Sequence, residues 1–320
     1  MLQKPGRNGG QSLYVLAYHR VIEPDSQMPG LDMVSATPAQ FDAQMQLLAR
    51  EYHPVTAEDV LNAFDRGTPL PRYAVLVTVD DGYRDFQDTI FPIASRYGIR
   101  PVLFVPTQFM GQGYFWWDRL PLALSSARVN EIDTPVGRFS LRTATGQTQA
   151  LARLSDYVRV QPFEQARQWV EDLCNEIAPD LPDSGHATLD WGELRALARA
   201  GVDIASHTHS HPILSHVSLE QARREIRLSQ DLIAREIGRV LPIFAFPDGR
   251  HHAMNQALLP VLQSEGFRLA FTRIEGRARL DRDEPLQLPR LGVSLPMSLA
   301  QFHLHLTPLY DIWKNRRLGL

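Results

Sequence analysis

The feature that most constrains the fold is an apolar run that ends in two adjacent carboxylates. Residues 74–79 are all apolar or β-branched, and they lead directly into Asp80, Asp81 and Gly82. A run that is apolar on both faces predicts a strand buried in a parallel sheet. Parallel sheets and barrels carry their chemistry at the carboxyl ends of their strands. The run therefore predicts an α/β fold with a carboxylate pair at its functional edge.

The carboxylate pair itself has two interpretations. Adjacent carboxylates repel each other, and such a pair persists where a cation neutralises one while the other has a separate task. The alternative is a solvated turn, because Asp-Gly pairs are common in turns. A second segment favours the cation: residues 201–206 form another short apolar run, and His207, His209 and His211 follow it at alternate positions.

The three histidines suggest a metal site. Neutral imidazole is the commonest protein ligand for zinc-like metals, and two histidines four residues apart reach one ion if the segment between them turns. Pro212 disfavours helical geometry at His211, so a loop is expected there. We interpret His207 and His211 as metal ligands. His209 is expected to diverge and to be hydrogen-bonded or solvent-facing.

Composition limits the classes of function. The 320 residues carry 33 basic and 36 acidic side chains without a basic block, so nucleic acid is not an expected partner. The single cysteine, Cys174, excludes an intramolecular disulfide framework and a cysteine zinc cluster. The polar N-terminus lacks a signal-peptide core, and no apolar run approaches the roughly 18 residues of a membrane helix. We therefore expect a cytoplasmic protein without a transmembrane segment.

Short apolar strands alternate with amphipathic helices along most of the chain. Helix caps are predicted at Thr37, Asp190 and Ser218, and Gly238 is predicted to end the helix that follows the histidines. This alternation predicts a parallel sheet, open or closed into a barrel. The expected strands are 13–18, 74–79, 101–105, 202–205, 243–246 and 269–272. A polar N-terminal tail is expected at residues 1–12, a C-terminal tail at residues 307–320, and the folded domain at residues 13–306.

One long segment, about 107–189, interrupts this alternation of strands and helices. It contains helix-like stretches at 147–160 and 163–177 and a candidate hairpin at 137–142. We interpret it as an insertion between two core strands that lies over one end of the sheet, a common place for lids and binding loops. Its Trp116 and Trp117 suit stacking on a sugar face, and they equally suit anchoring the insertion to the core.

A third segment places a backbone donor at the same edge. Residues 243–246 form a strand that runs into the turn Pro247-Asp248-Gly249. The backbone N–H of Asp248 is thereby expected at the rim that carries the other two motifs. A rigid donor beside a metal is what a tetrahedral oxyanion requires.

Taken in this order, the three segments resemble the motifs of the polysaccharide deacetylase family (carbohydrate esterase family four, the NodB-homology domain). The first motif, Thr-Phe-Asp-Asp-Gly, is matched by residues 78–82 with Val79 in place of Phe. The second, His-Ser/Thr-x-x-His, is matched by residues 207–211, and the third ends in the turn at 247–249. The opening residues 16–21 also resemble the first strand of many members.

The resemblance implies a fold, an activity and roles for single residues. It implies a distorted (β/α)7 barrel that removes N-acetyl or O-acetyl groups from sugars with a divalent metal, most typically zinc. Carried over by position, Asp81, His207 and His211 look like the metal ligands and Asp80 like the general base. The backbone N–H of Asp248 looks like part of the oxyanion hole.

The chain also departs from the family pattern. Members often have an arginine ahead of the third turn that steadies the base, but residues 241–244 contain none. Arg290 is the candidate replacement, with a surface ion pair as the alternative. The late histidine that acts as general acid has no convincing match, so His19, His251, His252 and metal-bound water remain open for that role. His19 is also a candidate substrate contact.

The sequence thus predicts a metal-dependent deacetylase that removes acetyl groups, with N-acetyl favoured, from a saccharide or glycan precursor. Association with a polysaccharide-assembly machinery is expected if the substrate is a glycan under construction. Two alternatives remain: a hydrolase of another non-peptide C–N bond on the same scaffold, and a catalytically inactive carbohydrate-binding relative.

Overall fold

Seven parallel strands close into a barrel, which confirms the predicted (β/α)7 fold. The computed structural model describes residues 12–24, 33–111, 115–159, 161, 163–181, 188–307 and 310. The barrel strands are β1 (Ser12–Tyr18), β5 (Ala74–Asp80), β6 (Val102–Val105), β9 (Asp203–Ser206), β10 (Ile243–Ala245), β11 (Leu269–Glu275) and β13 (Leu288–Gly292). Pairing of β1 with β5, in register from Leu13 opposite Ala74 to Tyr18 opposite Val79, closes the ring.

Six strands of the described chain lie outside this ring, and four of them are short strands close to β1 and β5. β12 (Ala278–Arg279) runs antiparallel to the start of β1, and β4 (His53–Pro54) pairs with the start of β5. β2 (Arg20–Val21) and β3 (Val34–Ala36) pair with each other just after β1.

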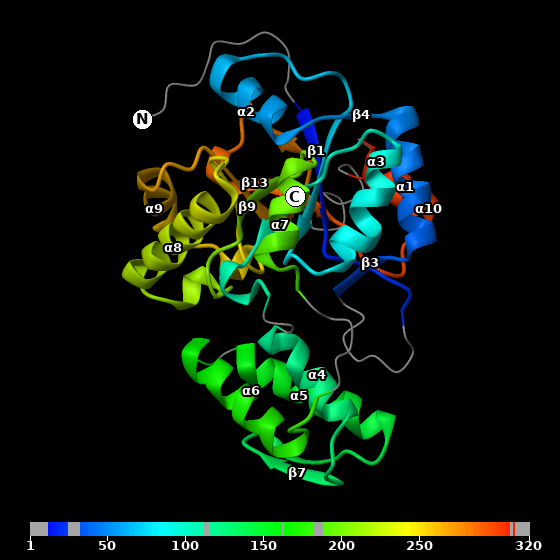
Figure 1. Ribbon diagram of the computed structural model, residues 1–320, viewed down its shortest axis with the longest axis vertical. Helices are drawn as coiled ribbons and strands as arrows, with labels where there is room; N and C mark the ends of the chain where they lie inside the picture. Colours follow the sequence, from blue (N-terminus) through cyan, green and yellow to red (C-terminus); the bar gives the residue numbers. More distant parts are fainter. Residues whose placement is uncertain are drawn as a thin grey trace.

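Helices surround the barrel (Figure 1), and the caps predicted from the sequence are present. Capping boxes at Thr37 and Asp190 begin two of them, Ser218 caps a third, and Gly238 ends that third helix at φ +78°. These side chains satisfy backbone N–H groups that a helix start leaves without partners. The helices are α1 (Pro38–Glu51), α2 (Ala57–Arg66), α3 (Phe91–Arg96), α7 (Trp191–Arg199), α8 (Leu219–Ile237), α9 (Leu258–Ser264) and α10 (Leu299–His305).

The barrel interior is apolar at one end and polar at the other. Ala74 and Leu76 of β5 belong to an interior cluster with residues of the other strands, and α2 packs against this cluster. Side chains alternate along a strand, so the next inward positions of β5 are Thr78 and Asp80, both buried. The carboxyl end of the barrel is therefore the end that presents polar groups.

The segment between β6 and α7 forms a separate helical unit at the bottom of Figure 1, at the opposite end of the molecule from α2. Its apolar side chains, with Cys174 among them, form a core of their own. The hairpin pairs residues 137–140 with 131–134, so the segment predicted as a hairpin supplies only its second strand. The elements are α4 (Trp116–Ser125), β7 (Glu131–Thr134), β8 (Gly137–Ser140), α5 (Ala144–Arg159) and α6 (Phe163–Ile177).

No helix in the described ranges combines the length and the apolar character that a membrane crossing demands. The domain limits expected from the sequence, 13–306 with an insertion at about 107–189, stay a prediction.

Candidate active site

The carboxyl ends of the barrel strands bring the predicted residues together. Asp80 ends β5 and Asp81 follows it, while His207 follows β9. The backbone is unusual here. Four of the five non-glycine residues with positive φ in the described chain lie in these turns: Asp81, Thr208, His211 and Asp248. Such conformations cost on the order of 1–3 kcal/mol each and cluster at functional sites.

Asp80 is held by a buried arginine. Nη1 and Nη2 of Arg290 donate to Oδ1 and Oδ2 of Asp80 at 2.8 and 2.7 Å. The guanidinium also donates to the Thr78 hydroxyl at 3.1 Å and the Thr272 carbonyl at 2.8 Å, and Arg290 is fully buried. Burial alone would raise the pKa of Asp80, but the Arg290 charge outweighs it and holds the pKa well below its ordinary value. Asp80 is therefore a fixed, ionised carboxylate.

Asp81, His207 and His211 converge on one point. Their ligand atoms lie within 4.8 Å of one another. The two Nε2 atoms are 3.2 Å apart, and Oδ1 of Asp81 lies 3.6 Å from Nε2 of His207 and 3.5 Å from that of His211. Ligands of a tetrahedral ion with bonds of about 2.0–2.1 Å are about 3.3 Å apart. The three atoms thus have the mutual spacing of ligands to a single ion.

The protonation states also suit metal binding. Nδ1–H of His207 donates to the Ala245 carbonyl at 2.8 Å, which leaves Nε2 unprotonated and directed at Asp81. Burial lowers the pKa of both His207 and His211, so both rings are neutral at neutral pH. Burial and the adjacent Asp80 charge raise the pKa of Asp81, so the ionised form that binds a metal needs a cation beside it.

Asp81 supplies the strongest indication that the residues fit a metal. Both of its carboxylate oxygens are buried, and across the described ranges neither has a hydrogen-bond partner. A carboxylate left without partners in the interior costs several kcal/mol, and a cation at this point removes that cost. Two neutral imidazoles and one carboxylate are also a donor set typical of catalytic zinc, which keeps further positions open.

The turn between the two histidines is held by residues that the sequence did not predict. His209 diverges, as expected, and its Nδ1 lies 3.0 Å from the Thr107 hydroxyl. Glu225 of α8 accepts hydrogen bonds from the backbone of His209 and from Ser210. The local signal was that two polar residues, Glu225 and Ser229, lie among the buried apolar positions of α8, and this pattern does not indicate what they contact.

The third motif forms the turn that was predicted. Asp248 has φ +55°, and its carboxylate contacts Arg250 at 3.3 Å and His252 at 2.7 Å. A Cβ on Gly249 would lie 2.7 Å from the backbone nitrogen of Arg273, so only glycine fits this approach to β11. The backbone N–H of Asp248 has no acceptor among the hydrogen bonds found in the described segments.

The remaining residues that the sequence suggested for proton donation or substrate contact lie in different surroundings. His19 is buried at the end of β1, where burial and the charge of Arg273 lower its pKa to about 3, so its ring is neutral at neutral pH. His251 and His252 are exposed beside the third turn. Trp116 and Trp117 begin α4, but their side chains lie outside the described part of the structure.

The insertion is attached directly to the turn that carries Asp81. Leu189 N–H donates to the Gly82 carbonyl at 2.9 Å, and the Tyr83 hydroxyl donates to Asp118 of α4 at 2.8 Å. The Arg20 guanidinium lies 4.5 Å from the centroid of the Tyr83 ring. Burial raises the pKa of Asp118 to about 6. No motif in the sequence indicates a role for Tyr83 or Asp118.

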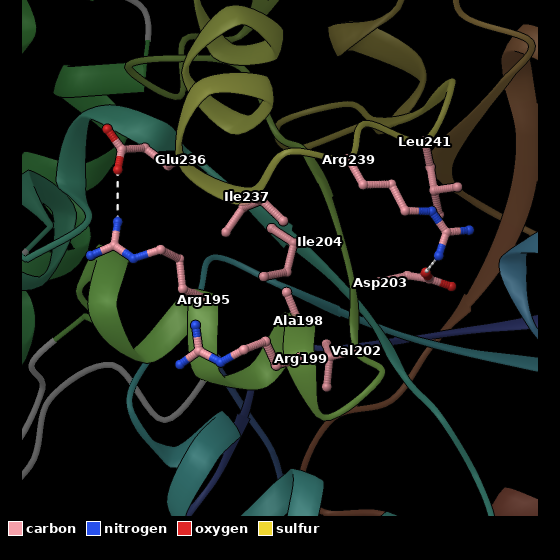
Figure 2. Close-up of a pocket in the computed structure, with 10 residues that line it drawn as sticks. All are labelled: Arg195, Ala198, Arg199, Val202, Asp203, Ile204, Glu236, Ile237, Arg239 and Leu241. Atoms are coloured by element: carbon pink, nitrogen blue, oxygen red, sulfur yellow. Dashed lines mark hydrogen bonds and ion pairs between the residues drawn. The ribbon is translucent and has the colours of Figure 1, made fainter.

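A surface pocket of about 250 Å³ lies elsewhere, between the ends of α7 and α8 and the start of β9 (Figure 2). Its walls include Arg195, which is ion-paired with Glu236, and Arg239 beside Asp203. The pocket contains none of the residues described above. It opens at the amino end of the barrel strands, so we assign it no part in the chemistry.

Fold and site together define an α/β-barrel protein with three potential metal ligands, Asp81, His207 and His211, at its rim. The family model for polysaccharide deacetylases matches residues 67–270, and the chain belongs to this family. The family agrees with the enzyme class predicted from the sequence, a carbohydrate deacetylase acting on non-peptide C–N bonds.

Solved structures share the fold. The chain is similar to the Streptococcus pyogenes deacetylase PplD in complex with acetate, with a TM-score of 0.65 and 18% identity over 94% of this chain and 100% of that one. It is also similar to IcaB from Ammonifex degensii, with a TM-score of 0.60 and 17% identity over 93% and 97% of the two chains.

A curated relative matches over a short segment. The chain is 41% identical over 46 residues to poly-beta-1,6-N-acetyl-D-glucosamine N-deacetylase of Escherichia coli K12. The match covers 14% of this chain and only 7% of that protein.

Proposed function

We propose that this protein is a metal-dependent deacetylase that hydrolyses the acetamide of an N-acetylated saccharide. The observation that carries the proposal is the pairing of two different carboxylates at one rim. Asp80 is locked to Arg290, while Asp81 is buried without a hydrogen-bond partner in the described chain and faces two neutral imidazoles. Different surroundings thus suit Asp80 to act as a base and Asp81 to bind a metal, although the two residues are adjacent in sequence.

Asp81, His207 and His211 would hold the divalent metal, and zinc suits their nitrogen and oxygen donors best. A metal held there supplies Lewis acidity for the acetyl carbonyl and lowers the pKa of a bound water.

The other groups act on protons and on the oxyanion. The ionised Asp80 accepts a proton from the attacking water, and Arg290 holds its carboxylate in place. The backbone N–H of Asp248 donates a hydrogen bond to the oxyanion that forms on the acetyl carbonyl. His19, neutral and buried beside these groups, suits a contact with bound saccharide better than protonation of the leaving amine.

The substrate class proposed is a glycan or glycan precursor that carries N-acetylglucosamine. The similarity to the poly-beta-1,6-N-acetyl-D-glucosamine N-deacetylase of Escherichia coli K12 motivates this choice, together with the family assignment. Stacking of Trp116 and Trp117 on the sugar, a cytoplasmic location and association with a polysaccharide-assembly machinery remain predictions from the sequence.

The test is acetate release from β-1,6-linked N-acetylglucosamine oligomers, measured with the purified protein before and after treatment with a chelator. We expect activity that the chelator abolishes and that added zinc restores. A parallel panel of small formamides and cyclic amides separates hydrolases of other C–N bonds. Turnover of the small amides alone would reassign the substrate, and binding of the oligomers without acetate release at any metal concentration would identify an inactive carbohydrate-binding relative.

A further inference from the structure

One carboxylate from a neighbouring helix organises the turn that carries both histidines. Oε2 of Glu225 accepts hydrogen bonds from the backbone N–H groups of His209 at 3.0 Å and of Ser210 at 2.7 Å. Oε1 of the same side chain accepts from the Ser210 hydroxyl at 2.8 Å. Both carboxylate oxygens are therefore used on two consecutive residues between His207 and His211.

The turn needs such support because its backbone is strained. Thr208 has φ +70° and His211 has φ +59°, a region that residues with a Cβ rarely adopt. Inside the turn, the Thr208 hydroxyl accepts from His211 N–H at 3.0 Å. Hydrogen bonds to an ionised acceptor are roughly twice as strong as neutral ones, so the Glu225 carboxylate is well suited to offset the strain.

Glu225 belongs to a polar stripe on α8 that faces the turn. Ser229 lies four residues further along the helix, on the same face, and is fully buried. It accepts a hydrogen bond from the Ser206 hydroxyl at 2.8 Å, and Ser206 in turn accepts from Thr208 N–H at 3.3 Å. The flanking residues Ala222 and Ile226 are buried apolar side chains, as a core-facing helix surface requires.

The charge of Glu225 is directed to the turn rather than to a cation. Three arginines lie within three residues of it on α8, but Arg223 and Arg227 pair with Glu265 and Arg224 pairs with Glu220. Within the described part of the chain, Glu225 has no ion pair with an arginine, lysine or histidine, and it is not among the three potential metal ligands.

We propose that Glu225 is a positioning residue that sets the geometry of His207 and His211 for metal binding, so that metal affinity depends on a side chain that does not touch the metal. This inference rests on the metal site of the proposed function. Residues that orient metal ligands from outside the ligand set typically change metal affinity by about 10–100-fold when they are replaced.

The experiment compares Glu225→Gln with the wild-type chain and with a matched control, Glu220→Gln. Glu220 is on the same helix, but it is exposed and pairs with Arg224 at the surface. The zinc dissociation constant is measured by competition with a chromophoric chelator, and the visible spectrum of the cobalt(II)-substituted protein reports the ligand geometry. We expect zinc binding about 10–100-fold weaker in Glu225→Gln, an altered cobalt spectrum and activity that saturating zinc restores, with Glu220→Gln unchanged.

The outcomes are distinguishable. Equal zinc affinity and an identical cobalt spectrum in wild-type and Glu225→Gln proteins would overturn the role of Glu225 and leave the proposed function intact. A wild-type protein that binds no zinc would refute the proposed metal site itself. If Glu225→Gln does not fold, the zinc affinity of Ser210→Ala is measured instead. This variant removes only one of the three hydrogen bonds that Glu225 accepts. Zinc binding by Ser210→Ala that is measurably weaker, by less than about 10-fold, supports the proposal. An unchanged zinc affinity contradicts it.

Discussion

The two ends of the barrel are built from the same seven strands but obey different physical constraints. At the amino end, the interior is filled with apolar side chains, α2 packs against them, and the charged residues form partly exposed pairs such as Arg195 with Glu236 (Figure 2). At the carboxyl end, Asp80, Asp81 and Arg290 are almost completely buried.

The difference indicates that the carboxyl end holds buried charged groups that depend on one another, while the charged pairs of the amino end lie at the surface. Buried charges and positive-φ residues are unfavourable for folding, and they persist where catalysis or binding needs them. At the amino end, the partly exposed ion pairs are expected to contribute little to stability. The predictions below test this contrast, in order of decreasing expected effect.

The largest effect is expected from Asp80→Asn. The amide cannot accept a proton from the attacking water, so acetate release should fall by about 10²–10⁴-fold while zinc binding is retained. Zinc content and acetate release are measured on the same sample, with Asp81→Asn as the matched variant that should lose the metal. An Asp80→Asn protein that loses its zinc would mean that the two aspartates have exchanged roles.

Arg290→Gln should cost the most in stability. It leaves the buried Asp80 carboxylate without its cation, and loss of one partner of a buried pair typically costs about 3–5 kcal/mol. The free energy of unfolding is measured in urea. The double variant Asp80→Asn/Arg290→Gln should be less destabilised than the sum of its parts, and strict additivity would argue against a direct pair.

Asp118→Asn is expected to be stabilising, in a pH-dependent way. Burial raises the pKa of Asp118 to about 6, above its unfolded value of 3.8. The folded state therefore favours the protonated carboxyl, and the contribution to stability that is present below pH 3.8 is lost as the pH rises through about 6. The asparagine amide does not ionise, so this loss of stability no longer occurs. Its oxygen can still accept the hydrogen bond from the Tyr83 hydroxyl.

For the metal-free protein we expect Asp118→Asn to gain about 1–2 kcal/mol at pH 8 and almost nothing at pH 3.5, after allowing for the partial exposure of the side chain. Urea unfolding at the two pH values measures the gain. A gain of the same size at both would exclude the ionisation of Asp118 as its cause.

The smallest effect is expected at the amino end, from Arg195→Gln. The pair with Glu236 has an N–O distance of 2.8 Å, but the arginine side chain is 44% exposed. Pairs of this kind contribute at most about 1 kcal/mol, and salt screens them. Acetate release should be unchanged. A loss of acetate release in Arg195→Gln would contradict the view that the amino end of the barrel has no part in the reaction.

Much of the site could be predicted because its motifs are local. Apolar runs that end in Asp80-Asp81 or in His207 identify strand ends from a few residues, and the parallel arrangement then places them at one rim. Arg290 was a candidate only because the usual arginine was missing; its two hydrogen bonds to Asp80 depend on the distance between β13 and β5 across the barrel. Nothing near Glu225 in sequence indicates that it meets Ser210.

The amino-acid order alone determined the alternation of strands and helices, the caps of the helices and the family motifs, because each depends on side chains a few residues apart. Tertiary structure decided which of two neighbouring carboxylates is held by an arginine and which is left to face the imidazoles. That choice depends on burial and on side chains more than 120 positions away, and no local pattern encodes those distances.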